Sequence, residues 1–317
     1  MKTRTLTGLA IAFIAIVVFL TKIIIPTTIV FDVFIGIIAI IAAYEIAALL
    51  KKSGRNNHNY LIIAFPIAFY VLLFLAMHFS LSALLTGVLA AALLALFFAV
   101  SVIITLCSPM KTAKEIKNSR TSSGTFKYSL SKGLNTVLGI LYPTVPFMLL
   151  VPINHLSDIS YVFSTTITNP ELTSTILLAL VFVIAFICDT FAYLTGKLIG
   201  GKKLVPHISP NKTIAGSIGG FVWTMFILVT LFIVLNSVDS IAQVFAALSL
   251  TWWKVLIIGF VGSLVCQLGD IIESVIKRRA NVKDSGDFLP GHGGILDRID
   301  GFILIVPFVF ILMLLLI

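Results

Sequence analysis

The sequence predicts an all-α integral membrane protein that crosses the bilayer about nine times. Hydrophobic residues make up 59% of the 317 positions, and charged residues only 11%. Many apolar runs reach the roughly 20 residues that a helix needs to cross about 30 Å of hydrocarbon. The runs are continuous and lack the alternation of a transmembrane β-strand, so a helical bundle is the expected way to satisfy the backbone in lipid.

Nine segments have the required length and apolar character. The predicted spans are 6–25, 28–50, 60–78, 82–106, 134–152, 173–195, 216–236, 254–276 and 301–317. The first 20 residues also have the basic start of a signal peptide, but no clear small-residue cleavage site follows before Lys22, so we treat 6–25 as a span. By content we divide the chain into residues 1–133, with the first helices and a basic loop, and 134–317, with the candidate catalytic region.

Lysine and arginine predict the orientation. Twenty of the 22 fall on one side of the predicted spans, in the segments 2–4, 51–55, 111–132, 197–212 and 277–298. The other side has only Lys22 and Lys254. Because short cytoplasmic loops retain basic residues, we expect a cytoplasmic N-terminus and a C-terminus outside.

The net charge of +9 does not predict a nucleic-acid-binding protein, because the basic residues are spread over short loops as topology signals. Residues 111–132 form the longest basic segment. It is either a solvated retention signal or a segment that lies on anionic headgroups. Three cysteines, Cys107, Cys188 and Cys266, form no CxxC pair, which argues against zinc and favours small packing residues.

Three polar segments are predicted at the cytoplasmic face. The first contains Asp189 and Gly196 near the end of a span, and an intramembrane carboxylate is a functional candidate because burying it unpaired is costly. A structural hydrogen bond, or an ion pair with Lys197, is the alternative. The second runs from Ser209 to Gly220, where hydroxyls, a lysine and the amides of a helix start favour an anion site. Lys212 could equally be a flanking retention charge.

The third segment begins at Gln267 and is the most informative. Asp270, Glu273 and Lys277 follow helical spacing and share one face of the eighth predicted helix. After a loop with Lys283, Asp284 and His292, Asp297 and Asp300 recur three residues apart where the ninth helix starts. Two acidic helix faces are thus expected to meet across one loop.

This pattern favours a hard divalent cation such as Mg²⁺, which binds carboxylate oxygens and shares its waters with phosphates. Asp270 and Asp297 are the first candidates for metal ligands. Glu273 could hydrogen-bond to a ligand without binding the metal itself. The spacing does not fit an EF-hand, and the one histidine there, His292, is too few for zinc. A turn and a phosphate contact are about equally good readings of His292, and Arg298 could simply pair with Asp300.

The third segment resembles the signature of the phosphatidate cytidylyltransferase family, also called CDP-diacylglycerol synthases. The matching residues are Ser274-x-Ile276-Lys277-Arg278, Lys283-Asp284-x-Gly286 and Leu289-Pro290-Gly291-His292-Gly293-Gly294-Ile295-x-Asp297-Arg298-Ile299-Asp300. The other two segments are similar to family motifs, so the resemblance covers about the last 130 residues. Asn211 and Ala215 depart from the Lys and Glu that the family commonly has.

The resemblance implies a dimeric, multi-helix enzyme. It joins CTP and phosphatidic acid into CDP-diacylglycerol and pyrophosphate, using Mg²⁺ with or without a monovalent cation such as K⁺. Because the sequence shows no eukaryotic extension or retention signal, we expect the enzyme in a bacterial cytoplasmic membrane. We assign Asp270 and Asp297 to metal, with Asp189 and Asp300 as further ligands or supports. The phosphate candidates are Lys212, Lys277, Arg278 and Lys283, and the remaining substrate-binding candidates are Ser209, Asp284 and His292.

Two other functions stay open on the residues alone. A CTP-dependent polyprenol kinase would also need membrane helices and a phosphate site, but it would release CDP and not pyrophosphate. A cation transporter would explain intramembrane acids such as Asp189 and Asp270, but it gives no reason for the charged loop between 283 and 298.

Overall fold

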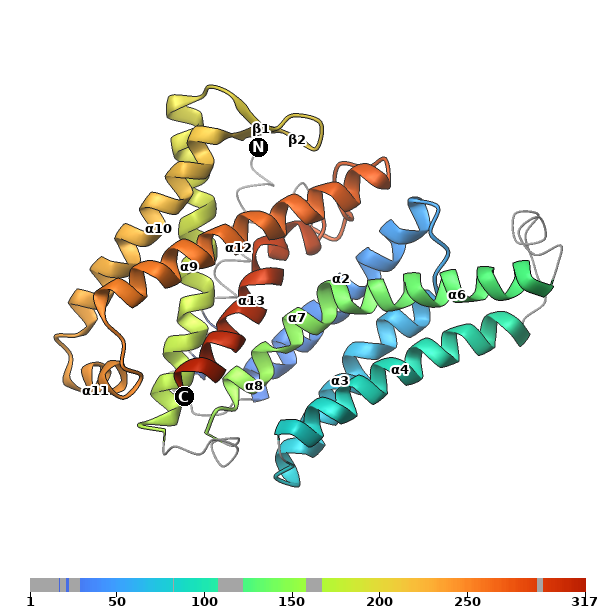
Figure 1. Ribbon diagram of the computed structural model, residues 1–317, viewed down its shortest axis with the longest axis horizontal. Coiled ribbons are helices and arrows are strands. Elements are labelled where there is room, and N and C mark those ends of the chain that lie inside the picture. The colour runs from blue at the N-terminus through green and yellow to red at the C-terminus, as the bar shows by residue number, and fades with distance from the viewer. Residues whose placement is uncertain are drawn as a thin grey trace.

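The computed structural model describes residues 17, 21–22, 29–81, 83–107, 122–157, 167–289 and 293–317, and they form a bundle of long helices (Figure 1). Eight helical segments in these ranges are long and apolar enough to cross a membrane. This confirms the predicted all-α, polytopic fold. The predicted first span, 6–25, lies outside the described residues except for positions 17, 21 and 22.

Apart from the span predicted at 134–152, the other predicted spans match observed helices within a few residues. The amino-terminal half contains α2 (Ile29–Lys52), α3 (Asn59–His78), α4 (Ala83–Cys107) and α6 (Ser122–Gly139). The carboxyl-terminal half contains α9 (Pro170–Ile199), α10 (Ile214–Leu235), α12 (Trp252–Arg279) and α13 (Leu296–Leu316). In Figure 1 the second group lies to the left and the first to the right.

The span predicted at 134–152 is interrupted. After α6 the chain forms a π-helical turn, η1 (Ile140–Thr144), and two short helices, α7 (Val145–Met148) and α8 (Leu150–Asn154). Tyr142 has extended backbone angles of −130° and 111°. The residue before a proline is pushed out of the helical region, and Pro143 follows Tyr142, so the sequence itself explains the break.

Two small elements were not predicted. A two-stranded antiparallel hairpin of β1 (Lys203–Val205) and β2 (Ser209–Thr213) precedes α10, where the sequence predicts only a polar loop. A short helix, α11 (Asp239–Ala247), fills the connection between α10 and α12. The hairpin and α11 lie at opposite ends of the bundle (Figure 1).

Helix α2 connects the two groups. It contacts α3 and α6 on one side and α12 and α13 on the other. Its buried face is rich in small side chains, including Ala39, Ala42, Ala43 and Ala47. Small residues let helices approach closely where lipid provides no hydrophobic driving force between them. The helix is therefore one connection between the two groups, beside the segments η1, α7 and α8, which also contact helices of both groups.

His58, in the turn between α2 and α3, joins this turn to α4. Its Nε2 lies 3.1 Å from Ser101 O and 2.8 Å from Thr105 Oγ1, and its Nδ1 lies 3.2 Å from the Tyr60 hydroxyl. A neutral ring with its proton on Nε2 donates to Ser101 O and accepts at Nδ1. Burial, and then the positive charge of Lys132, lower the pKa of His58 to about 4.

We expect His58 to make the fold sensitive to mild acid. The pKa is about 4 in the folded protein and 6.5 in the unfolded chain. The unfolded chain therefore binds more protons between these values, and stability is lost as the pH falls from about 6.5 to 4. Thermal unfolding in detergent at pH 7 and pH 5 should show a smaller acid-induced drop in Tm for His58→Gln than for the unmodified protein. His78→Gln, at an exposed position, is the control, and equal drops in all three proteins would contradict the prediction.

Candidate active site

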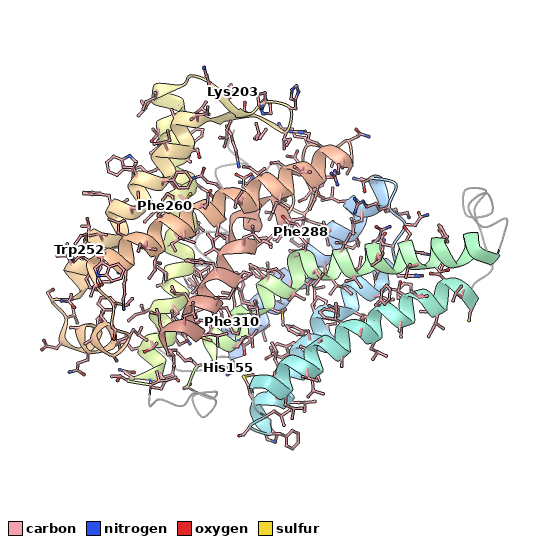
Figure 2. The ribbon with its side chains drawn as sticks, in the orientation of Figure 1. His155, Lys203, Trp252, Phe260, Phe288 and Phe310 are labelled. Atoms are coloured by element: carbon pink, nitrogen blue, oxygen red, sulfur yellow. The ribbon has the colours of Figure 1, made fainter. Side chains whose placement is uncertain are left out.

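The predicted site residues gather at the end of the bundle where the hairpin lies. Figure 2 shows Lys203 of the hairpin at this end, while His155 lies at the opposite end. Helices α9 and α12 end here, and α13 begins here. The local folding reason is that charged and glycine-containing segments interrupt the apolar runs at these points.

Lys277 lies between two carboxylates. Its Nζ is 2.5 Å from Glu273 Oε2, one helical turn earlier on α12, and 2.6 Å from Asp297 Oδ1 in the first turn of α13. The Glu273 side chain is fully buried, and those of Lys277 and Asp297 are 13% and 8% exposed. The predicted meeting of the two acidic helix faces is therefore confirmed, and a buried lysine holds them together.

Asp297 also organises the loop before its own helix. Its Oδ2 accepts hydrogen bonds from Ser285 N and Gly294 N, both at 2.8 Å, and lies 3.0 Å from Ser285 Oγ. These donors fully occupy Oδ2. Its Oδ1 accepts from Lys277 and keeps one further lone pair, since a carboxylate oxygen has two. A cation can therefore bind Asp297 only through Oδ1 and beside the lysine.

Three other carboxylates converge from α9, α12 and α13. The charges of Asp189 and Asp300 both interact with that of Asp270. The backbones of α12 and α13 touch here, because a Cβ on Gly269 would lie 2.6 Å from Asp300 O. A Cβ on Gly301 would lie 3.5 Å from Asp189 Oδ2, which places that carboxylate at the same turn of α13. The crossing needs glycine and sets the acidic groups side by side.

Lys212 of β2 connects the second predicted segment with the third. Its ammonium forms an ion pair with Asp270 Oδ2, and the two side chains are 25% and 27% exposed. A partly exposed pair can be opened by a ligand at smaller cost than a buried one. The hairpin thus places a lysine at the acidic cluster. This position favours a role for Lys212 in the candidate site over a role as a flanking retention charge.

Gln267 fixes α10 against α12. Its amide accepts a hydrogen bond from Ser217 Oγ, and its Nε2 donates to Ser217 O at 3.2 Å. Ser217 lies in the first turn of α10, directly after the hairpin. These bonds hold the start of α10, which directly follows the strand that carries Lys212, in a fixed position relative to Asp270, three residues after Gln267.

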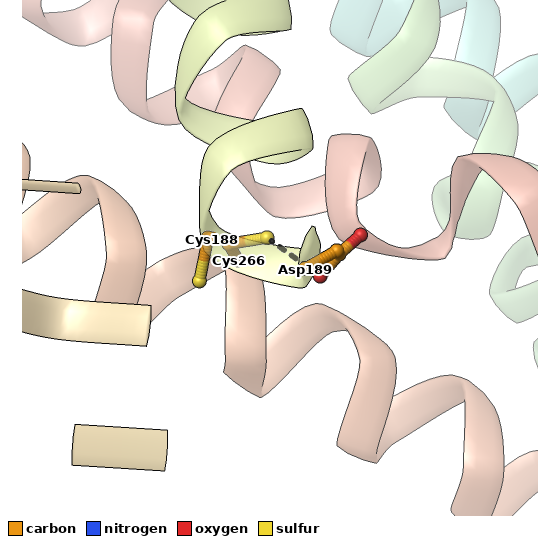
Figure 3. A group of neighbouring side chains, drawn as sticks. All are labelled: Cys188, Asp189 and Cys266. Atoms are coloured by element: carbon orange, nitrogen blue, oxygen red, sulfur yellow. Dashed lines mark hydrogen bonds between the residues drawn. The ribbon is translucent and has the colours of Figure 1, made fainter. Parts of the chain in front are cut away.

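Two cysteines lie beside Asp189 (Figure 3). Cys266 Sγ is 3.7 Å from Asp189 Oδ1, and Cys188 Sγ is 3.6 Å from Ser263 O. Both thiols are buried, whereas Cys107 is exposed. Cys266 is a weak donor to the Asp189 carboxylate, whereas Cys188 donates to a backbone carbonyl, and both thiols pack between helices as expected for small buried residues.

Other predicted residues have different surroundings. Arg278 donates from Nε to Ile208 O at 3.0 Å and from Nη1 to Val282 O at 3.3 Å, so it ties the hairpin to the end of α12. Lys283 and Asp284 are exposed in the loop, and Ser209 is half-buried on β2. Their substrate roles stay predictions. His292 lies outside the described residues.

The family model of the cytidylyltransferases matches residues 2–316 of this chain. The chain belongs to this family. Proteins named phosphatidate cytidylyltransferase from Staphylococcus saprophyticus, Staphylococcus epidermidis and Bacillus subtilis are 42%, 44% and 44% identical to it over 132, 132 and 131 residues. These segments cover 42%, 42% and 41% of this chain and 46%, 46% and 45% of those proteins, so the chain spans about half the length of the curated relatives it matches. Its long apolar helices make it a multi-pass membrane protein, and the bacterial relatives fit a cell membrane.

The oxygen-rich cluster of this cytidylyltransferase-family chain fits a hard divalent cation. Asp189, Asp270 and Asp300 offer carboxylate oxygens from three helices that cross here, and the charge of Asp270 interacts with the charges of the other two. Mg²⁺ prefers such oxygens and usually keeps several waters. Asp300 Oδ1 accepts from Gly301 N at 2.8 Å, which orients this carboxylate. The donor set therefore suits the predicted metal, although Asp270 shares its charge with Lys212.

Two clusters were missed by the sequence analysis. Glu45 of α2 is 3% exposed and hydrogen-bonds to the loop before α13. At the opposite end, Asp32 of α2 lies 2.6 Å from His155 Nε2 and accepts from Asn154 Nδ2 at 2.9 Å. The available signal was the same for both residues: a single acid inside a long apolar run has to find a polar partner.

Proposed function

We propose that this protein joins CTP and phosphatidic acid to give CDP-diacylglycerol and pyrophosphate at the end of the bundle where α9, α12 and α13 meet. The observation that carries the proposal is the convergence of Asp189, Asp270 and Asp300 beside Lys212, in a chain of the cytidylyltransferase family. The names of the similar bacterial proteins support the choice of lipid substrate.

The reaction needs charge neutralisation and alignment more than proton transfer. A phosphate oxygen of phosphatidic acid attacks the α-phosphorus of CTP. The bond from this phosphorus to the bridging oxygen of the β-phosphate breaks, and the electron pair leaves with pyrophosphate. The second pKa of a phosphate monoester is near 6, so the attacking oxygen is largely ionised at neutral pH.

The acidic cluster is the proposed holder of Mg²⁺. Asp189, Asp270 and Asp300 would bind it, with Asp297 Oδ1 as a fourth candidate. The ion would neutralise triphosphate charge and orient the α-phosphorus for attack in line with the leaving group. A monovalent cation such as K⁺ beside it is part of the proposal that rests on the family signature alone.

Lysines supply the remaining positive charge. Lys212 is the first candidate for the triphosphate, because its pair with Asp270 is partly exposed and can open toward a more highly charged partner. Lys277 is held between Glu273 and Asp297, so it would act from a fixed position. Preorganised charge of this kind stabilises a transition state without reorganisation during the reaction.

Lipid and a second copy of the chain are the further proposed partners. Lys212 and Asp270 are partly exposed on a bundle of membrane-spanning helices, so we propose that a lipid headgroup and a soluble nucleotide can both approach the cluster. The homodimer is supported by the resemblance of the signature to the family. Cross-linking in native membranes tests it, and a monomer alone would remove this part of the proposal.

The activity is tested by incubating the detergent-purified protein with phosphatidic acid, Mg²⁺ and α-labelled CTP. We expect label in the lipid phase together with one pyrophosphate per lipid, and loss of both on chelation. Label that remains in water as CDP would replace the proposal with a CTP-dependent kinase. No turnover by folded protein, with cation flux in vesicles, would replace it with transport.

Asp297→Asn is expected to reduce turnover by about 10²–10³-fold. An amide cannot accept from both Lys277 and the loop N–H groups, because its NH₂ must face one of these donors. Turnover over a range of Mg²⁺ concentrations and the yield of monodisperse protein are the measurements. Asp287→Asn, an exposed acid of the same loop, is the matched control. Full activity of Asp297→Asn would contradict the assignment of this residue.

A further inference from the structure

Glu45 is a buried carboxylate of the amino-terminal half that contacts the loop bearing the candidate catalytic residues. Its Oε1 accepts from Ile295 N at 2.9 Å, and its Oε2 accepts from Leu296 N at 2.8 Å. Ser285 Oγ lies 2.9 Å from the same Oε2. These partners are 240 to 251 residues away in the sequence, so only the fold brings them together.

The contacts make Glu45 the N-terminal cap of α13. The first N–H groups of a helix have no partner within the helix, and a negative charge near them is stabilised by the helix dipole. The residue at the cap position, Ile295, has no side-chain acceptor of its own. Glu45 supplies this acceptor from another helix and so fixes the start of α13, one residue before Asp297.

Ser285 links Glu45 to Asp297. Its hydroxyl lies 2.9 Å from Glu45 Oε2 and 3.0 Å from Asp297 Oδ2. A hydroxyl has one proton, so it donates to one of the two carboxylates at a time. The Ser285 N–H donates to Asp297 Oδ2 as well, at 2.8 Å. Glu45 and Asp297 therefore both position Ser285, so a shift of either carboxylate is expected to move the other through this serine.

Two glycines of the signature leave room for the Glu45 carboxylate. A Cβ on Gly286 would lie 2.8 Å from Glu45 Oε1, and one on Gly294 would overlap both Ser285 Oγ and Glu45 Oε2. Real Cβ atoms do not approach oxygen this closely. The loop is thus shaped around Glu45, which gives these two glycines a physical role in the site.

We infer that Glu45 is a positioning residue: it holds the loop from Ser285 to Asp297 in the geometry that turnover requires, and makes α2 part of the active-site framework. This inference rests on the proposed function for its effect on turnover. It does not depend on that function for its effect on the loop, because the hydrogen bonds involve only residues of this chain.

The test compares Glu45→Gln with Asp32→Asn. Glutamine keeps the size of the side chain, but its NH₂ faces an N–H or hydroxyl donor. Asp32→Asn replaces a buried carboxylate at the opposite end of the same helix with a neutral amide. The partners of Asp32 there include His155 and Asn154. Both variants are expected to lower Tm in detergent. The control therefore separates general destabilisation of α2 from loss of the loop contacts.

Hydrogen exchange of the peptides that contain Ser285, Ile295 and Leu296 is the first measurement. We expect about tenfold or faster exchange in Glu45→Gln and unchanged exchange in Asp32→Asn, because only the first variant opens amides of the loop. In the cytidylyl-transfer assay we expect kcat to fall by about 10²-fold in Glu45→Gln, since small misplacements of reacting groups have effects of this size. KM for CTP should change much less, and Glu45→Asp should retain an intermediate kcat.

Unchanged loop exchange in Glu45→Gln would overturn the inference, and so would equal losses of kcat in Glu45→Gln and Asp32→Asn at equal Tm. A wild-type protein without cytidylyl transfer would overturn the proposed function instead. In that case the exchange experiment still decides whether Glu45 holds the loop, because it requires no substrate.

Discussion

Asp270→Asn is expected to reduce turnover about 10³-fold or more, the largest loss that we predict for a single carboxylate. Asp270 lies at the centre of the acidic cluster: its charge interacts with those of Asp189 and Asp300, and it forms the ion pair with Lys212. Asparagine keeps the shape of the side chain but removes one negative charge. Both the affinity for a divalent cation and the position of Lys212 should change.

The measurement is the rate of lipid-linked cytidylate formation at saturating CTP over a series of Mg²⁺ concentrations. If Asp270 binds the metal, higher Mg²⁺ should recover only a small part of the lost activity. Asp239→Asn on α11, an exposed acid at the opposite end of the bundle, provides the control for general effects of charge. A variant that kept the wild-type rate and Mg²⁺ dependence would remove Asp270 from the site.

Several features of this site follow from local sequence patterns. Helical spacing places Asp270, Glu273 and Lys277 on one face of α12, and the ion pair between Glu273 and Lys277 shows that this spacing was correctly interpreted. Hydropathy predicts the spans because a backbone in lipid has few alternatives to a helix. The break at Tyr142 was not predicted, although Pro143 carries a physical reason for it.

Long-range partners could not be predicted in the same way. Nothing near Glu45 in the sequence indicates that its carboxylate oxygens accept hydrogen bonds from the N–H groups of Ile295 and Leu296. These bonds depend on how α2 packs against α13. Arg278 is a second example. Its charge and position favour a phosphate ligand, but in the fold its guanidinium binds the carbonyl groups of Ile208 and Val282. A sequence pattern predicts which groups need partners, whereas packing selects the partners.

Lys277→Met is expected to destabilise the protein by about 3–5 kcal/mol and to abolish turnover, because it removes the cation between two buried carboxylates. Asp297 would keep hydrogen bonds from Ser285 N and Gly294 N. Glu273 would keep nothing comparable: apart from its ion pair with Lys277, neither of its oxygens has a hydrogen-bond donor among the described residues. The instability should therefore come mainly from Glu273.

This asymmetry predicts which second substitution restores stability. Lys277→Met combined with Glu273→Gln removes one positive and one negative charge, so the buried charge returns to its original balance and most of the lost Tm should be recovered. Turnover should stay absent, because the positive charge that we propose to act on the triphosphate is still missing beside Asp297. Glu273→Gln alone is the control, and its loss of Tm should be smaller than that of Lys277→Met. If the double variant melted no higher than Lys277→Met, an unpaired Glu273 would not be the cause of the instability, whereas recovery of both Tm and turnover would show that Lys277 serves only to neutralise its neighbour.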